Sequence, residues 1–234
     1  MQNRRVLDIG KAVLAKNQGL AQELREEFAR CGTLVLNLVS SPGSGKTELL
    51  AKTLDRLAGR LDVGVIVGDL ATDNDAQRMQ GRGARVLQVN TDGYCHLEAN
   101  MVRAGYEALG AGRMDLLFIE NVGNLVCPSS HDLGEDLRVA LLSTTEGEDK
   151  PLKYPTLFKA SHLAVLTKLD LAEAVEFDRG SAVRNILSVA PQLRLMETSA
   201  RTGQGLDEWC GFLLERVADK QARSADPGQL LAAE

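Results

Sequence analysis

Residues 40–47 read SSPGSGKT, which places a Gly-rich stretch directly before a lysine and a hydroxyl side chain. An apolar run precedes these residues and a helical pattern follows them, so successive backbone N–H groups can converge on phosphate oxygens at a helix N-terminus. The usual pattern G-x-x-x-x-G-K-[ST] begins with Gly, whereas this sequence has Ser40. The stretch still predicts a phosphate-binding loop, and its expected nucleotide contacts are Gly43, Ser44, Gly45, Lys46, Thr47 and Glu48.

Acidic side chains that follow two later apolar runs are candidates for holding Mg²⁺ beside the phosphates; they are Asp69, Asp73, Asp75 and Glu120. A carboxylate at a strand end can bind the ion directly or through water, and a Gly N–H shortly after it can sense the γ-phosphate. We expect Thr47 and Asp69 to hold Mg²⁺, while Gly123 supplies the sensing N–H. A solvated loop acid or a helix cap is the alternative for each carboxylate. The candidate catalytic residues are Lys46, Thr47, Asp69, Glu120 and Gly123.

A guanine site is indicated by two short patterns in the second half of the chain. Asp170 in the string LTKLD can accept two hydrogen bonds from the Watson–Crick edge of guanine, and the Lys168 side chain can pack on the ring. Adenine has no such pair of donors. After the last apolar run, the string TSARTG offers the backbone N–H groups of Ser199 and Ala200 to the guanine oxygen. A small-molecule kinase would share the phosphate loop, but this sequence has no Arg-rich lid segment. A guanine motif would also have no role in such a kinase.

A metal site is indicated by the adjacent pair Cys95 and His96 together with Cys127, which lies seven residues beyond Glu120. Both segments follow apolar runs, so we expect the two loops on the nucleotide side of the sheet, where they can meet. Two thiolates and one imidazole suit Zn²⁺ or Ni²⁺, and three protein ligands leave one position open for transfer or for a second subunit. The alternative is a pair of small buried thiols and a surface imidazole. His131 is open between an auxiliary ligand and a solvated loop residue.

Seven apolar runs rich in Val, Leu and Ile must form the strands that position these loops; they are residues 33–39, 63–68, 84–89, 115–120, 138–144, 162–167 and 193–198. Helix-length segments separate most of them, at residues 46–59, 72–81, 94–109, 175–188 and 206–219. Continuous apolar strands separated by helices predict a doubly wound, mainly parallel α/β sheet with helices on both faces. Residues 5–30 have apolar positions at helical spacing with an interruption near residues 17–19, which predicts two short helices.

The 234 residues suffice for a sizeable core, and we expect a helical appendage at 1–32, a nucleotide-binding domain at 33–220 and a disordered tail at 221–234. A net charge of −5 without a basic stripe argues against a nucleic-acid partner. The sequence contains no run of 18 apolar residues, so we expect no membrane-spanning helix. Four scattered cysteines do not form a secreted disulfide pattern, so we expect a soluble, cytoplasmic protein. Structural roles are expected for Cys31, Cys210 and His162.

The motifs resemble those of the nickel-incorporation GTPases of hydrogenase maturation, the HypB family within the metal-chaperone branch of the P-loop GTPases. The resemblance covers residues 5–220, and its most specific carriers are SSPGSGKT, GDLATDNDAQR, the Cys95-His96 pair and ENVGNLVCP with Cys127. The urease accessory GTPases are the nearest relatives by pattern, but the last two carriers look more like the hydrogenase branch. Thr167 stands where Asn is usual in the guanine motif, and its hydroxyl can still brace the loop.

The resemblance implies a GTPase that inserts nickel into a hydrogenase large-subunit precursor, with GTP or GDP, Mg²⁺ and either Ni²⁺ or Zn²⁺ as ligands. It also implies a homodimer favoured by GTP and a small zinc-containing accessory protein as a partner. No arginine finger is evident near the phosphate loop, so we expect intrinsic hydrolysis far below about 1 per second. Cys127 follows the phosphate-sensing segment directly, so nucleotide state is expected to move a metal ligand. A nucleotide-gated dimerisation module and a urease-type nickel accessory GTPase are the alternatives.

Overall fold

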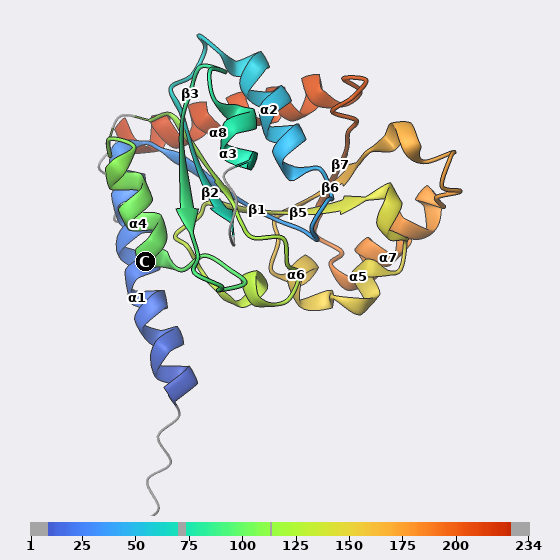
Figure 1. Ribbon diagram of the computed structural model, residues 1–234, viewed down its shortest axis with the longest axis horizontal. Coiled ribbons are helices and arrows are strands. Elements are labelled where there is room, and N and C mark those ends of the chain that lie inside the picture. The colour runs from blue at the N-terminus through green and yellow to red at the C-terminus, as the bar shows by residue number, and fades with distance from the viewer. Residues whose placement is uncertain (1–8, 70–73, 113, 226–234) are drawn as a thin grey trace, which may run out of the picture.

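Seven strands form one sheet in which every paired strand runs parallel to its neighbours, with helices on both faces (Figure 1). The computed structural model describes residues 9–69, 74–112 and 114–225. The strands are β1 (Leu34–Val39), β2 (Val63–Asp69), β3 (Ala84–Asn90), β4 (Leu116–Glu120), β5 (Leu137–Ser143), β6 (Leu163–Thr167) and β7 (Arg194–Glu197). They lie in the order β3-β2-β4-β1-β5-β6-β7, so β5, β6 and β7 follow β1 outward on one side, whereas β4 lies between β1 and β2 on the other. The predicted doubly wound α/β fold is confirmed.

The helices are α1 (Ile9–Cys31), α2 (Lys46–Leu57), α3 (Asn74–Met79), α4 (Ala99–Ala108), α5 (Lys150–Lys153), α6 (Pro155–Lys159), α7 (Arg179–Val189) and α8 (Leu206–Ala225), with 3-10 turns η1 (Cys127–Ser130), η2 (Thr144–Glu146) and η3 (Leu169–Leu171). Each of the five segments predicted as helices contains a helix of the structure; these helices are α2, α3, α4, α7 and α8. Helices α5 and α6 were not predicted, because 4 and 5 residues are too few to show a helical period. Within the described ranges, no helix has the length and apolar composition needed to cross a membrane.

The helices form two layers because successive side chains of each strand point to opposite faces of the sheet. In β1, Leu36 and Leu38 belong to the core that α2, α3 and α8 cover, whereas Val35 belongs to the core that α1 and α4 cover. A third cluster joins β5 and β6 to α6 and α7. Figure 1 shows α2 and α8 along the upper side of the sheet, with α1 and α4 side by side at its left end.

The N-terminal segment is one continuous helix, α1, so the prediction of two short helices there is wrong. Asn17, which suggested an interruption, is 6% exposed; its amide donates to the Asp132 carbonyl at 2.7 Å and accepts from Ala99 N–H at 2.8 Å. Leu24 and Phe28 are fully buried against the sheet, and the Phe28 ring meets the Tyr106 ring edge to face. Tertiary contacts therefore stabilise a helix through a stretch whose local propensity is poor.

The C-terminal helix α8 continues to Ala225, past the predicted start of a loose tail at residue 221. Residues 226–234 lie outside the described part of the chain. Trp209 and Leu213 on this helix are fully buried, and the Trp209 indole N–H donates to the Thr53 hydroxyl of α2 at 2.9 Å. The boundaries proposed for an appendage, a nucleotide-binding domain and a tail stay a prediction.

All strands run parallel, so their carboxyl ends lie at one edge of the sheet, where loops carry binding residues in folds of this kind. The phosphate loop follows β1, and the ends of β2 and β4 with their following loops meet it around one cavity. The loops after β6 and β7 meet around a second cavity beside it. The loops after β3 and β4 carry the cysteines of the predicted metal site.

Candidate functional site

The phosphate loop connects β1 to α2 and requires glycine at two positions. Gly43 and Gly45 have φ angles of +71° and +95°, in the left-handed region that side chains disfavour, and α2 begins at Lys46 immediately afterwards. This arrangement brings backbone N–H groups and a helix N-terminus to one side of the loop. A cavity of 360 Å³ lies there, lined by residues 42–48, 68–69 and 120–123 together with Asp75 and Arg78. The predicted phosphate site therefore coincides with a cavity of the fold.

Lys46 reaches back across the loop and donates from Nζ to the Ser40 hydroxyl at 2.8 Å. Ser44 donates to the same hydroxyl oxygen, and both Ser40 and Ser44 are buried. Ser40, which stands where the usual pattern has Gly, thus supplies a partner for the lysine. Burial lowers the pKa of Lys46, with the Glu120 carboxylate acting in the opposite sense.

Thr47 and Glu120 are joined by a hydrogen bond of 2.7 Å from the threonine hydroxyl to Oε1. Glu120 is 2% exposed, and this burial raises its pKa to about 7 despite the nearby Lys46. Its other oxygen, Oε2, is buried without a hydrogen-bond partner among the described residues. An unpartnered carboxylate oxygen beside a hydroxyl and Asp69 is a donor set that fits Mg²⁺. Asp75 lines the same cavity, whereas Asp73 lies outside the described residues.

The segment after β4 touches the phosphate loop so closely that it must carry glycine. A Cβ atom at Gly123 would lie 2.9 Å from the Pro42 Cα atom and 3.0 Å from its nitrogen, closer than real Cβ atoms approach backbone. Any shift of the phosphate loop therefore acts directly on residues 120–123. Arg78 of α3 also lines this cavity, although the sequence patterns named no arginine there.

A second cavity of 190 Å³ adjoins the first and shares Gly45 and Glu48 with it. The Thr167 hydroxyl donates to the Ser44 carbonyl at 2.6 Å, and Lys168 Nζ donates to the Gly43 carbonyl at 2.6 Å. Thr167 thus braces the phosphate loop with its hydroxyl, as the sequence suggested for a threonine in place of the usual asparagine. Lys168 has a φ angle of +59° and lines this second cavity.

Asp170 and Ala200 line the second cavity, and the Ser199 hydroxyl donates to Asp170 Oδ1 at 2.6 Å. The Ser199 backbone N–H donates to the Gln204 carbonyl at 2.9 Å. This N–H is therefore already paired within the protein, and a base contact by the Ala200 N–H stays a prediction. Ser199 instead orients the carboxylate that the sequence assigned to guanine.

The loops after β3 and β4 bring Cys95, His96 and Cys127 together, with one potential ligand atom from each lying within 4.8 Å of the other two. Cys95 Sγ lies 3.7 Å from His96 Nδ1. A hydrogen bond with the Cys127 side chain raises the pKa of the Cys95 thiol, and burial and the nearby Cys127 charge act in the same direction. Burial and the nearby His131 lower the pKa of His96, which favours the neutral imidazole that metals bind.

The two metal loops meet across β2, which separates β3 from β4 in the sheet, so they do not come from neighbouring strands. Gly68 near the end of β2 makes this crossing possible. A Cβ atom there would lie 2.7 Å from Cγ of Leu97, the residue after His96. The fully buried Leu97 side chain occupies the space that a larger residue at position 68 would fill.

Of the remaining cysteines and histidines, which all lie within the described ranges, only His131 lies against the predicted metal ligands. Cys210 is buried in α8, as expected for a structural thiol, whereas Cys31 is exposed at the end of α1. His162 is exposed and accepts from the Arg138 backbone N–H at 2.9 Å. His131 follows η1 and stacks on His96 with ring centroids 3.8 Å apart, so it is not an isolated loop residue.

Polar residues that the sequence patterns overlooked connect the two regions. Asn121, directly after Glu120, accepts from Leu97 N–H at 3.1 Å and from Val122 N–H at 3.0 Å. Its amide donates to Asn37 Oδ1 at 3.2 Å. All of these groups are buried.

The same network reaches the second metal loop from Asn37. The Asn37 amide donates to Glu135 Oε1 at 3.1 Å, and Arg138 donates to the same oxygen. Arg138 also donates to the carbonyls of Ser129 and His131 at 2.6 and 2.8 Å. We call these residues, Asn37, Asn121, Glu135 and Arg138, the Asn121 network. The signal available in the sequence was Asn37 itself, a lone amide within the apolar string LVLNLV.

Comparisons with known proteins agree with this geometry. The model of the CobW/HypB/UreG nucleotide-binding domain matches residues 18–196. The hydrogenase maturation factor HypB of Rhizobium leguminosarum is 47% identical over 96% of this chain and 75% of its own, and that of Escherichia coli K12 is 48% identical over 91% and 73%. A crystal structure of Helicobacter pylori HypB in complex with nickel has a TM-score of 0.83 and 38% identity, covering 88% of this chain and 97% of its own.

A signal recognition particle protein from Aeropyrum pernix, solved with GDP, is 15% identical with a TM-score of 0.56 and shows the shared fold only. The identities to the HypB proteins are far higher and extend over nearly the whole chain. The chain therefore belongs to the CobW/HypB/UreG nucleotide-binding family and, within it, to the hydrogenase maturation factors HypB.

Proposed function

We propose that this protein binds and slowly hydrolyses GTP, and that the nucleotide state controls the delivery of nickel to a hydrogenase large-subunit precursor. The observation that carries this proposal is the Asn121 network, which begins beside Glu120 in the nucleotide cavity and is hydrogen-bonded to both loops that carry the thiols. A signal at the phosphates thus has a short physical route to the metal ligands.

The phosphate loop supplies the groups that hydrolysis needs. Backbone N–H groups after Gly43 and Gly45 receive the phosphate oxygens, and Lys46 exchanges its Ser40 partner for the β- and γ-phosphates. Thr47 and Asp69 hold Mg²⁺, with Glu120 beside them. A Mg²⁺ ion held there would offset the negative charge of the phosphate oxygens. Magnesium titrations of GTP hydrolysis test the assignment: Asp69→Ala should need far more Mg²⁺, and an unchanged dependence would show that Asp69 is not a ligand.

Guanine is recognised in the second cavity. Asp170, oriented by the Ser199 hydroxyl, accepts hydrogen bonds from the base, and the Lys168 stem covers the ring. The bond from Lys168 to Gly43 and that from Thr167 to Ser44 tie this cavity to the phosphate loop. Binding of the base therefore stabilises the same loop that holds the phosphates.

Nickel or zinc binds to Cys95, His96 and Cys127 as thiolates and a neutral imidazole. Thiolate and imidazole are suitable donors for both ions, and three protein ligands leave a position for transfer. The relative from Helicobacter pylori solved with nickel supports nickel as the cargo. Nucleotide exchange moves residues 120–123 against Pro42, and the Asn121 network passes that movement to the ligands.

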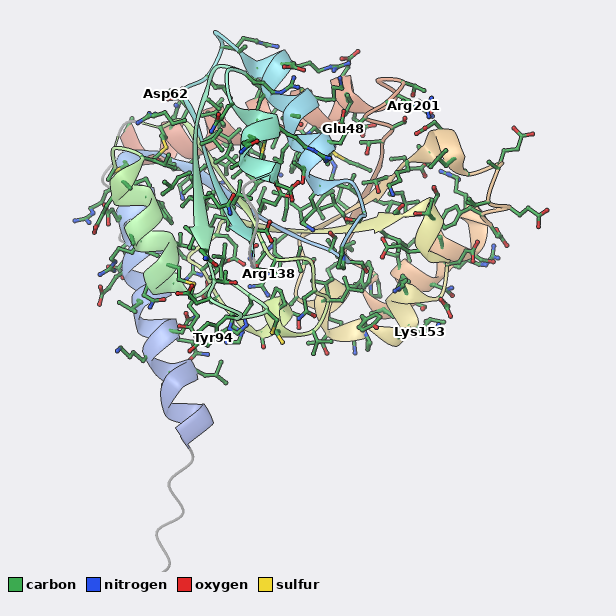
Figure 2. All side chains as sticks on the ribbon, in the orientation of Figure 1. Glu48, Asp62, Tyr94, Arg138, Lys153 and Arg201 are labelled. Atoms are coloured by element: carbon green, nitrogen blue, oxygen red, sulfur yellow. The ribbon has the colours of Figure 1, made fainter. Side chains whose placement is uncertain are left out.

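A GTP-favoured homodimer that receives nickel from a small zinc-containing accessory protein completes the proposal. Tyr94 and Val126, which adjoin Cys95 and Cys127, are 55% and 60% exposed, so apolar side chains flank the ligands at the surface. Figure 2 shows Tyr94 at the lower margin of the molecule, below Arg138. Sedimentation equilibrium with GDP or a nonhydrolysable GTP analogue, with and without Ni²⁺, tests the dimer; a monomer under all four conditions would exclude it.

Equilibrium dialysis with Ni²⁺ and with Zn²⁺ tests the coupling itself, in the presence of GDP or a nonhydrolysable GTP analogue. We expect the two nucleotides to give metal affinities that differ by about 5- to 150-fold, the usual range for coupled sites. Cys127→Ala should weaken binding and make the two affinities equal, whereas Cys210→Ala, which removes a buried thiol elsewhere, should behave like the parent. Equal affinities in the parent would contradict the proposal.

Delivery to urease is a second candidate function, because one relative carries both roles in its name. The "Hydrogenase/urease maturation factor HypB" of Helicobacter pylori is 37% identical over 92% of this chain and 89% of its own. Nickel transfer from the loaded protein to each apo-enzyme precursor separates the two functions. Transfer to the hydrogenase precursor alone is the outcome that we expect.

A further inference from the structure

His131 is oriented as a metal ligand, although it is not part of the Cys95, His96 and Cys127 set. Its Nδ1 lies 2.8 Å from the Cys127 carbonyl oxygen, which can only accept a hydrogen bond. Nδ1 therefore carries the hydrogen, and Nε2 carries the free electron pair. A hydrogen bond from the other ring nitrogen to a carbonyl is the usual way in which proteins orient a ligating histidine.

His96 faces this histidine and has an unsatisfied nitrogen of its own. The two rings stack with centroids 3.8 Å apart and an angle of 32° between their planes. His96 Nε2 is buried without a hydrogen-bond partner among the described residues, a costly state for a ring nitrogen in a protein interior. Glu98 Oε1 lies 3.9 Å from this nitrogen, which is too far for a hydrogen bond.

His96, Glu98 and His131 together meet the distance requirement for a metal site. One potential ligand atom from each lies within 4.8 Å of the other two, and all three residues are half-buried. An ion between them would satisfy the orphaned His96 nitrogen and approach the unhydrogenated nitrogen of His131. Two imidazoles and a carboxylate suit divalent Ni²⁺ and Zn²⁺, but they bind these ions less strongly than a set with two thiolates.

We propose that His96, Glu98 and His131 form a second position for Ni²⁺ or Zn²⁺, lined by nitrogen and oxygen, next to the thiolate position. His96 belongs to both ligand sets, and a neutral imidazole has only one free electron pair. The two positions therefore cannot both use His96 at once, and one ion moves between them. This inference rests on the proposed function for the identity of the ion, but its geometry does not depend on the nucleotide.

The second position gives the protein a labile site beside a tight one. An ion released by the thiols stays beside the same two loops on weaker nitrogen and oxygen ligands, from which an acceptor can remove it. Because Arg138 donates to the His131 carbonyl, the Asn121 network reaches this position as well as the thiolate loop.

Metal binding without nucleotide, followed by Ni²⁺ competition titration and ultraviolet absorption, tests the second position. The double variant Cys95→Ser/Cys127→Ser should still bind one Ni²⁺ per protomer, more weakly than the parent and without a sulfur-to-nickel charge-transfer band. Adding His131→Phe, which keeps a ring of similar size, should weaken that residual binding by at least about 10-fold. Glu98→Gln on the same double variant should weaken it in the same direction.

His162→Asn on the double variant is the matched control, since it removes an exposed histidine and keeps an acceptor for the Arg138 N–H. It should leave residual binding unchanged, and circular dichroism should show equal folding of all variants. Residual binding that is absent, or that is insensitive to His131→Phe and Glu98→Gln, would overturn the second position. If the nickel-loaded parent shows no charge-transfer band, that result counts against the thiolate site of the proposed function. Failure of the second position and failure of the thiolate site are therefore distinguishable.

Discussion

Ser44 and Lys46 in the phosphate loop are 1% and 7% exposed and have protein partners, whereas Cys95, His96 and Cys127 in the metal loops are half-buried. Thr167 and Lys168 tie two carbonyls of the phosphate loop to the end of β6, but the buried Nε2 of His96 has no hydrogen-bond partner among the described residues. One region is held by the protein before any ligand arrives. The other contains groups that a metal ion would satisfy.

This difference suits what each region must bind. Phosphate groups have a constant shape, so a loop of preset backbone N–H groups loses little entropy on binding them. An ion that must be passed on is better served by ligands that can rearrange, because its release then leaves no large strain behind. The Asn121 network joins a preset region to an adaptable one, which is the arrangement that a switch requires.

The largest expected effect separates the two regions completely. Lys46→Ala removes the charge that offsets the β- and γ-phosphates, so GTP hydrolysis should fall by about 10³-fold, with GTP binding lost together with it. Nickel affinity measured without nucleotide should not change, because the Lys46 ammonium is hydrogen-bonded to Ser40 within the phosphate loop. Isothermal titration with GTP and with Ni²⁺ measures both, and a loss of nickel binding would show that the regions are not separable.

Glu120 tests whether burial of a carboxylate in the phosphate-loop region destabilises the nucleotide-free protein. Its folded pKa of about 7 lies above the value near 4.5 that it has when unfolded, so the folded protein holds the extra proton between these values. The free energy of unfolding of the nucleotide-free protein should therefore fall as pH rises from 4.5 to about 7, by on the order of 3 kcal/mol. Glu120→Gln keeps an acceptor for Thr47 and should abolish this contribution.

Urea unfolding at several pH values gives the free energy of unfolding as a function of pH for the parent and for Glu120→Gln. The difference between these two curves is the contribution of the Glu120 carboxyl. The variant should be the more stable protein at pH 8 and should hydrolyse GTP more slowly. Parallel curves would mean that the carboxylate is not a high-pKa group.

Asp170 sharpens the comparison within the nucleotide region, since it concerns the base and not the phosphates. Asp170→Asn replaces an acceptor-only carboxylate with an amide, which should weaken GTP binding by about 10- to 100-fold relative to xanthosine triphosphate, whose edge suits an amide better. The maximal rate of hydrolysis should stay close to that of the parent. Competition between the two nucleotides measures the preference, and a parent-like preference would exclude Asp170 from base recognition.

Asn121 tests the connection between the regions and should have the smallest effect on either site alone. Asn121→Ala removes the partner of Leu97 N–H and of Asn37, so nickel affinity should become less sensitive to GTP, by about 1–3 kcal/mol of coupling free energy. Asn185→Ala is the matched control, because it loses a bond to the Glu148 carbonyl and neither residue lines the nucleotide cavities or belongs to the metal groups. Nickel titrations with GDP and with a GTP analogue decide it, and full coupling in Asn121→Ala would exclude this route.

Seven strands and most helices could be predicted because their signals are local. A buried parallel strand needs a continuous apolar run whatever lies beside it, and a long amphipathic helix shows its period over many residues. The errors fell where tertiary contacts outweigh such signals. Asn17 looks like a helix breaker in the sequence, yet its amide is a buried anchor between α4 and the Asp132 loop within a continuous α1.

The two binding regions divide along the same physical line. The sequence alone determined the phosphate loop, because its function resides in backbone N–H groups of a contiguous strand–turn–helix whose glycines, lysine and threonine lie side by side in the chain. Only the tertiary structure decided how the metal loops meet across β2, with Gly68 leaving room for Leu97. It also decided that Asn121, which lines the cavity beside the phosphate loop, is hydrogen-bonded to Leu97 and Asn37. The partners of a buried polar side chain depend on which strands become neighbours, and that is settled by packing of the whole sheet.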